Sequence, residues 1–235
     1  PEPHEGRGRL RLMTTDGGRA AVPVRLKITE IFLSIQGEGL TAGVPTVFVR
    51  LTGCPLRCTY CDTAYAFSGG DYLTVPQILD RVRAFGTQHV TVTGGEPLAQ
   101  AGAHDLMRTL CDAGHAVSLE TSGALDVAAV DPRVVRVLDL KTPSSGECAR
   151  NLYTNLEHLR SGDQVKFVLV DRADYDWAAA TATQYDIASR ACVLFSPAWG
   201  QLDAAALAEW MLADRLPYRL QLQLHKILWG EAPGR

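Results

Sequence analysis

The sequence predicts an α/β protein whose mostly parallel strands form a partial, modified TIM-type barrel. Two observations carry this prediction. From Ile28 onward, strand-like runs alternate with helix-like runs, and this alternation is typical of parallel sheets. Six or more such strand–helix units favour a closed or partly closed α/β barrel. The 235-residue length fits one such domain better than two.

The domain is expected to start after a short extension. Residues 1–26 are rich in Gly, Arg and Pro without clear periodicity, which predicts a flexible N-terminal extension. Residues 27–235 are expected to form a single domain.

The predicted strands are short runs rich in β-branched and other apolar residues. They cover residues 28–35, 46–51, 89–94, 116–121, 134–140, 164–170, 192–196 and 219–224.

The predicted helices have apolar residues three and four positions apart, as one buried face requires. Thr74 and Asp203 are expected N-caps, and Gly114 an expected C-terminal stop. The helical runs cover residues 75–86, 103–114, 151–159, 176–190 and 203–214.

Composition narrows the functional class. The formal net charge of −3 and pI of about 6.1 give no indication of direct binding to nucleic acid. No apolar run is long enough for a membrane span, and the N-terminus lacks a secretory pattern. A reducing, cytoplasmic setting is expected.

The segment LTGCPLRCTYCDTAY places Cys54, Cys58 and Cys61 just after a predicted strand. Three thiolates can hold three irons of a cubane cluster and leave the fourth iron open. The alternatives are buried cysteines or a zinc site, although structural zinc normally takes four protein ligands. Cys111, Cys148 and Cys192 are scattered and are expected to be small apolar residues.

The Cys-x3-Cys-x2-Cys loop, followed later by Gly94-Gly95-Glu96-Pro97 after a strand, resembles the radical S-adenosylmethionine (SAM) superfamily. That resemblance implies a radical SAM core with a [4Fe–4S] cluster on Cys54, Cys58 and Cys61. The open iron then chelates the methionine moiety of SAM. Alone, the GGEP segment could equally be an ordinary strand-to-loop turn.

Six ordered segments, over about residues 28–230, closely resemble the 7-carboxy-7-deazaguanine synthase family. They are SIQGEG, TGCPLRCTYCDTAYAFSGG, TVTGGEPLAQ, SLETSGAL, LDLKTPSSGE and QLQLHKILWG. The resemblance implies a lyase that breaks a carbon–nitrogen bond in queuosine (7-deazapurine) biosynthesis, a tRNA modification pathway. Its substrate would be 6-carboxy-5,6,7,8-tetrahydropterin, its product 7-carboxy-7-deazaguanine, and ammonia would be lost.

The resemblance implies that SAM carries the radical, so no catalytic side chain is expected. It also implies Mg²⁺, a homodimer, and an electron donor such as flavodoxin. The cofactor-binding residues expected by position are Tyr60, Cys61, Asp62, Gly95, Glu96, Glu120, Asp139, Leu140, Lys141 and Ser196. Many relatives read Ser-Pro-Lys where this chain reads Asp139-Leu140-Lys141, and the match at Ser196 is loose.

The same resemblance implies that Mg²⁺ binds to the hydroxyl of Thr63. It implies substrate contacts at Ile35, Gln36, Gly37, Arg50, Thr93 and His225. An arginine at position 50 can form a fork of hydrogen bonds with a carboxylate. Alternatives stay open: a simple turn at Gln36-Gly37, a surface charge on an edge strand at Arg50, and a structural histidine at His225.

Two other functional classes compete. A glycyl-radical-enzyme activase would share the cysteine spacing, but the SIQGEG segment argues against it. A non-enzymatic module with structural zinc would purify colourless and without labile sulfide.

Overall fold

The computed structural model describes residues 24–232 and 234. The predicted extension over residues 1–26 therefore lies mostly outside the described residues, and Arg25 and Leu26 already belong to the first strand. No helix in this part of the chain is long and apolar enough to cross a bilayer.

The described strands form one nine-stranded sheet in the order β3-β1-β2-β4-β5-β6-β7-β8-β9. β1 is antiparallel to both of its neighbours, β3 and β2. Every neighbouring pair from β2–β4 to β8–β9 is parallel. The predicted α/β class and the mostly parallel order are confirmed. The strands are β1 Arg25–Ile35, β2 Pro45–Leu51, β3 Asp71–Thr74, β4 His89–Gly94, β5 Ala116–Thr121, β6 Val135–Asp139, β7 Gln164–Leu169, β8 Cys192–Pro197 and β9 Arg219–Leu220.

Two strand predictions differ from the structure. The edge strand β3 was not predicted, because it is short and exposed at Asp71 and Tyr72. The predicted strand 219–224 is wrong beyond Leu220, where only Arg219 and Leu220 pair with β8. Its last residue instead begins a short helix.

The predicted helices over residues 75–86, 103–114 and 203–214 agree with the structure to within two residues at each end. The predicted helix over residues 176–190 is shifted: it begins at Arg172 and ends at Gln184, and Asp186 then has a positive φ of 46°. Thr74 caps α1 with a reciprocal bond to Gln77, and the Asp203 side chain accepts from two backbone amides of α4. Residues 151–159 contain a 3₁₀ helix, Tyr153–His158, rather than an α-helix. The α-helices are α1 Val75–Ala84, α2 Ala103–Asp112, α3 Arg172–Gln184, α4 Ala204–Asp214 and α5 Leu224–Trp229.

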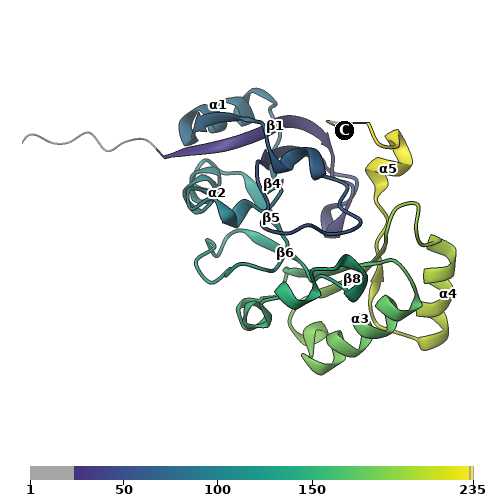
Figure 1. Cartoon of the computed structure of the whole chain (residues 1–235). Helices are drawn as coiled ribbons and strands as arrows, with labels where there is room; N and C mark the ends of the chain where they lie inside the picture. The colour runs from purple at the N-terminus through teal and green to yellow at the C-terminus, as the bar shows by residue number, and fades with distance from the viewer. Residues whose placement is uncertain (1–23, 233, 235) are drawn as a thin grey trace, which may run out of the picture.

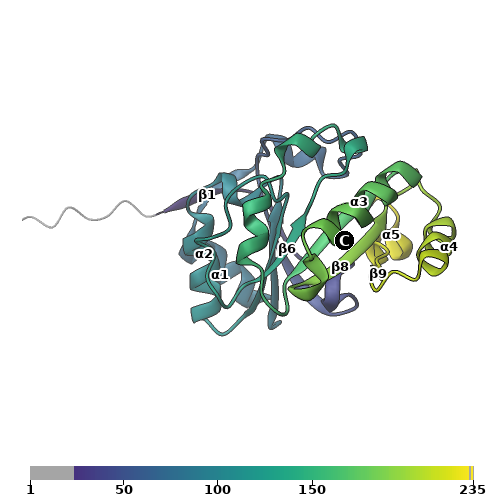
Figure 2. The same cartoon turned by 90° about the horizontal axis from the view of Figure 1, so that it is seen from below.

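The core has two parts, one for each half of the sheet. In the first half, α1 and α2 pack on β1, β2, β4 and β5; in the second half, α3 and α4 pack on the later strands. Figures 1 and 2 show the same division, with α1 and α2 beside one half and α3 and α4 beside the other. Helices cover the outside, which leaves the carboxyl ends of the parallel strands free for a site.

The segment after β9 returns to the end of β1. The Gly37 carbonyl accepts hydrogen bonds from Leu224 N at 3.0 Å and from Gln221 Nε2 at 3.4 Å. Gln221 Oε1 in turn accepts from Gly39 N at 2.7 Å. These contacts hold the beginning of α5 beside the end of β1, across the opening between the two ends of the sheet.

Candidate active site

One cavity of about 690 Å³ lies at the carboxyl ends of the strands. It gathers residues from segments far apart in the sequence, as expected for a parallel barrel. Most of the site residues expected from the sequence line it: Ile35, Gln36, Arg50, Cys54, Cys58, Tyr60, Cys61, Asp62, Thr63, Thr93, Gly95, Glu120, Asp139, Lys141, Ser196 and His225.

Three expected residues do not line the cavity: Gly37, Glu96 and Leu140. Leu140 is fully buried in the second half of the core. Gly37 lies behind His225, and Glu96 lies below the cysteine loop.

The cysteine loop is held on the end of β4 by backbone contacts. Glu96 N donates to Gly53 O at 2.8 Å, and Gly53 N donates to Ala66 O at 2.8 Å. A Cβ added to Gly95 would overlap Gly53 O and approach Cys54 Cβ. Glycine at position 95 therefore lets the two segments meet closely enough for both to face one ligand.

The thiols are partly buried at one end of the cavity. Burial raises the pKa of the Cys58 thiol to about 11, although Lys141 opposes this. Burial likewise raises the pKa of Cys54. A bound metal would remove these protons, since thiolates are the ligating form.

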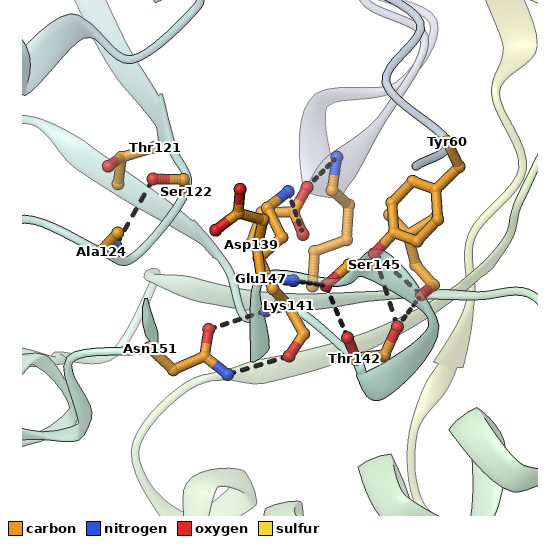
Figure 3. A network of polar contacts seen from close by, with 12 residues as sticks. Tyr60, Thr121, Ser122, Ala124, Asp139, Lys141, Thr142, Ser145, Glu147 and Asn151 are labelled. Atoms are coloured by element: carbon orange, nitrogen blue, oxygen red, sulfur yellow. Dashed lines mark hydrogen bonds and ion pairs between the residues drawn. The ribbon is translucent and has the colours of Figure 1, made fainter. Parts of the chain in front are cut away.

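The wall beside the thiols is made by the end of β6. Lys141 Nζ lies 3.1 Å from Asp139 Oδ1, and the Asn151 side chain bonds both the N–H and the C=O of Lys141 at 2.9 Å. Figure 3 shows these residues together, with the Tyr60 ring beside Thr142. Burial raises the pKa of Tyr60 to about 12, so the phenol stays protonated at neutral pH.

Glu96 organises the loops below the cavity. It is fully buried, and its carboxylate accepts hydrogen bonds from Thr121 Oγ1 at 2.9 Å, from Ser122 N at 2.7 Å, and from Leu98 N at 3.0 Å. The carboxylate thus ties the end of β4 to the end of β5.

A second polar wall is formed by Gln36, just after β1, and by side chains of β4 and β5. Gln36 Nε2 donates to Thr91 Oγ1 at 3.1 Å and to Glu120 Oε1 at 3.3 Å. Thr93 Oγ1 donates to Glu120 Oε2 at 3.0 Å. Burial raises the pKa of Glu120, and the nearby Glu38 charge adds to this.

Arg50 lies inside the sheet, because β2 is flanked by β1 and β4. This excludes the alternative of a surface charge on an edge strand. Its Nε donates to Glu30 Oε1 at 2.7 Å, and its guanidinium lies 5.9 Å from the Phe32 ring centroid and 5.8 Å from that of Tyr65. Arg50 is thereby held with its charged end in the cavity wall.

His225 and Lys226 belong to α5 rather than to the region after a strand. Burial lowers the pKa of the His225 imidazole, despite the nearby carboxylates of Glu38 and Asp62. The Lys226 ammonium lies 3.3 Å from Asp62 Oδ2. Helix α5 is therefore fixed to the residue that follows the last cysteine of the loop.

Thr63 and Asp62 lie together at the rim of the cysteine loop. Thr63 Oγ1 donates to Asp62 Oδ1 at 2.7 Å. Burial would raise the pKa of Asp62, but this bond and the Lys226 charge hold it down at about 2. The pair offers a hydroxyl and an ionised carboxylate, both of which suit a hard cation.

The sequence interpretation missed several cavity residues, among them the polar side chains of Glu38, Lys166 and Gln223. Burial would raise the pKa of Glu38, but the Lys166 ammonium holds it below its usual value. A signal did exist for Lys166, since it is the charged residue within the run QVKFVL of a central strand. Charges in such strands need a partner or a function.

Comparisons with known proteins agree with this geometry. Residues 48–140 match the model of the radical SAM superfamily. The 7-carboxy-7-deazaguanine synthase of Chlorobaculum tepidum is 48% identical over 87% of this chain and 94% of its own. That of Koribacter versatilis is 39% identical, over 87% and 97%.

The chain belongs to the 7-carboxy-7-deazaguanine synthase family. Among solved structures, the crystal structure of QueE from Escherichia coli has a TM-score of 0.72 at 23% identity. The match covers 86% of this chain and 95% of the E. coli chain, and it shows that the two share a fold.

Membership of the family makes the chain a radical SAM enzyme, which uses a [4Fe–4S] cluster and SAM. The cysteine loop fits that cluster. Among residues 24–232 and 234, no three His, Cys, Asp or Glu side chains are grouped to hold a single metal ion. A cubane instead takes one thiolate per iron, so its ligands lie farther apart. A closed zinc site would need four ligands around one ion.

Proposed function

We propose that this enzyme converts 6-carboxy-5,6,7,8-tetrahydropterin into 7-carboxy-7-deazaguanine with loss of ammonia, as a carbon–nitrogen lyase of queuosine biosynthesis. The observation that carries the proposal is that the cysteine loop and a polar wall suited to a pterin line the same cavity. Family membership supports the same reaction.

The pterin end of the cavity is the wall of Gln36, Thr93 and Glu120. A pterin presents several N–H groups along one edge, and the Glu120 carboxylate is an acceptor placed within this wall. Ile35 continues the same wall from β1. These residues would orient the ring, and Arg50 and His225 would bind its carboxylate. Gly37, expected from the sequence to contact the substrate, would act instead by supporting His225 from behind.

The cofactor end is the loop of Cys54, Cys58 and Cys61, which would hold three irons of the cluster. When bound, the cluster and SAM supply a 5′-deoxyadenosyl radical that removes and later returns a substrate hydrogen. The expected SAM contacts come from three places: the loop (Tyr60, Cys61, Asp62), the end of β4 (Gly95, Glu96), and the later strands (Asp139, the backbone of Leu140, Lys141, Ser196). Glu120, also expected from the sequence to contact the cofactor, would act at the pterin wall, where it bonds Gln36 and Thr93.

Glu96 is expected to act differently from the other residues of the cofactor end. Its side chain is saturated by Leu98, Thr121 and Ser122. We therefore assign it to positioning the Gly94–Glu96 backbone, whose carbonyls can accept from the SAM ammonium.

We assign Mg²⁺ to Thr63. Its hydroxyl faces the cavity next to the ionised Asp62. Mg²⁺ retains most of its water and often takes few protein ligands, so the pterin carboxylate and water would complete its shell.

The remaining features follow from the family. We propose that the enzyme works as a homodimer in the cytoplasm and receives electrons from a donor such as flavodoxin. Because Arg25 and Leu26 already belong to β1, residues 25–235 would form one radical SAM domain, with the residues before them as its extension.

The test is anaerobic turnover. Cluster-reconstituted chain, SAM, reductant, Mg²⁺ and the carboxy-tetrahydropterin should give the deazapurine and ammonia. Cys58→Ala should lose both cluster and product, whereas Cys111→Ala, on α2 and outside the cavity, should keep both. SAM cleavage without deazapurine would contradict the assignment of substrate.

A further inference from the structure

Lys166 carries a positive charge in the middle of the cavity floor. It lies on β7 between β6 and β8, and its side chain is 12% exposed. Its Nζ lies 2.6 Å from Glu38 Oε2 and 3.4 Å from Asp139 Oδ2. One ammonium therefore serves two carboxylates, one just after β1 and one at the end of the neighbouring strand β6.

The two carboxylates belong to different ends of the cavity. Glu38 follows β1, and its Oε1 also accepts from Gln223 Nε2 at 3.0 Å; it lies close enough to Glu120 to raise the pKa of that residue. Asp139 ends β6 beside Lys141, next to Tyr60 and Cys58. Glu38 is thus at the pterin end, and Asp139 at the cofactor end.

We propose that Lys166 is a positioning residue that couples the two ends of the cavity, so that bound pterin and bound SAM strengthen each other's binding. This inference rests on the proposed function for the identity of the two ligands.

The coupling follows from the geometry of a shared cation. A lysine ammonium has three donors on a flexible stem, so Lys166 can divide its bonds between Glu38 and Asp139. The Asp139 carboxylate is shared by two ammonium groups, with Lys141 Nζ 3.1 Å from Oδ1 and Lys166 Nζ 3.4 Å from Oδ2, so a donor group of SAM that bonds this carboxylate competes with both. Once Asp139 bonds SAM, Lys166 is released toward Glu38 and fixes that carboxylate for the pterin.

The reverse step must have the same strength, because coupling between two binding sites is reciprocal. Without the Lys166 charge, Glu38 and Glu120 would lose the ammonium that acts on both of them, and Asp139 would keep only its ion pair with Lys141. The affinity for each ligand would then no longer depend on whether the other ligand is bound.

The experiment measures binding without turnover. Cluster-loaded chain is kept anaerobic with the cluster unreduced, and SAM affinity is measured by equilibrium dialysis with and without saturating carboxy-tetrahydropterin. For the wild-type chain we expect the pterin to raise SAM affinity at least about fivefold, the lower end of typical coupling. Lys166→Met should bring this factor to about one, and Lys166→Arg should restore part of it.

The matched control is Lys27→Met, on β1. Lys27 Nζ lies over the Tyr72 ring on the outer edge of the sheet, and it does not line the cavity. This variant should keep the wild-type factor. Iron content and melting temperature are recorded for every variant. If Lys166→Met does not fold, Lys166→Met with Glu38→Gln removes both charges and should also have a factor of about one.

The outcomes separate this inference from the proposed function. A wild-type factor of one, or an equal factor in the wild type and the Lys166 variants, would overturn the role of Lys166 while leaving turnover intact. A wild-type chain that binds SAM but not the pterin would overturn both proposals.

Discussion

The α-carbon of Gly37 lies directly against the imidazole of His225. A Cβ added to Gly37 would overlap His225 Nδ1 and come within 3.0 Å of His225 N. The Gly37 carbonyl also accepts from Leu224 N, one residue before the histidine. Gly37 thus fixes the place of the histidine in the cavity wall, although it does not line the cavity itself.

Gly37→Ala should push His225 out of position. Overpacking of this kind typically lowers the free energy of unfolding by about 1–3 kcal/mol. Because His225 can move away, we expect a loss of stability no larger than this, together with a rise in the KM for the pterin. Unfolding in urea and steady-state kinetics would measure the two effects.

A double variant tests the cause of that effect. Gly37→Ala with His225→Ala should be more stable than the sum of the two single changes predicts, because the smaller side chain removes most of the overlap. Strict additivity would show that the two residues are not in contact.

The sequence was sufficient to predict elements whose signal is local. Strand β5 spans the predicted residues 116–121, because its apolar side chains alternate in and out. Placing Gly53, Gly94 and Lys141 at strand ends also needed only the alternation of strands and helices.

The rest depended on partners far away in the chain. The alternation in RLQLQL indicates a strand, but Gln221 bonds the Gly37 carbonyl and Gln223 bonds Glu38 instead of extending β9. Glu38 and Lys166 are 128 residues apart in sequence. Their pairing depends on how the sheet brings the end of β1 near β7, which no local sequence pattern predicts.

Arg50 gives a test of the pterin carboxylate site. Arg50→Lys keeps the charge but loses the planar fork. Losing one charge-assisted hydrogen bond costs about 2 kcal/mol, so we expect the KM for the pterin to rise roughly 30-fold.

The control for Arg50 is Arg108→Lys on α2. Arg108 is paired with Asp105 at an exposed position, and such pairs contribute little. Equal KM values for Arg50→Lys and the wild type would contradict a carboxylate contact at Arg50.

Glu96 gives a test of the loop framework. Glu96→Ala would leave the amides of Leu98 and Ser122 and the Thr121 hydroxyl without their buried acceptor. Buried donors without partners cost about 1–3 kcal/mol each, so we expect a loss of at least about 3 kcal/mol in the free energy of unfolding. Glu157→Ala, at an exposed position, should change it by less than about 0.5 kcal/mol. A loss at Glu96 no larger than at Glu157 would show that the bonds do not stabilise the loops.

Glu120 gives a pH test. Its folded-state pKa lies above the usual glutamate value of 4.5, because burial and the Glu38 charge disfavour ionisation more than Lys166, Thr93 and Arg50 favour it. The folded chain therefore holds this proton to higher pH than the unfolded chain does, and stability falls as the pH rises from about 4.5 through the folded-state pKa. Glu120→Gln has the same shape and no proton to lose. Its stability relative to the wild type should increase over that pH window, as measured by urea unfolding at a series of pH values. A difference that is constant with pH, or that decreases, would show that the pKa of Glu120 is not raised in the folded chain.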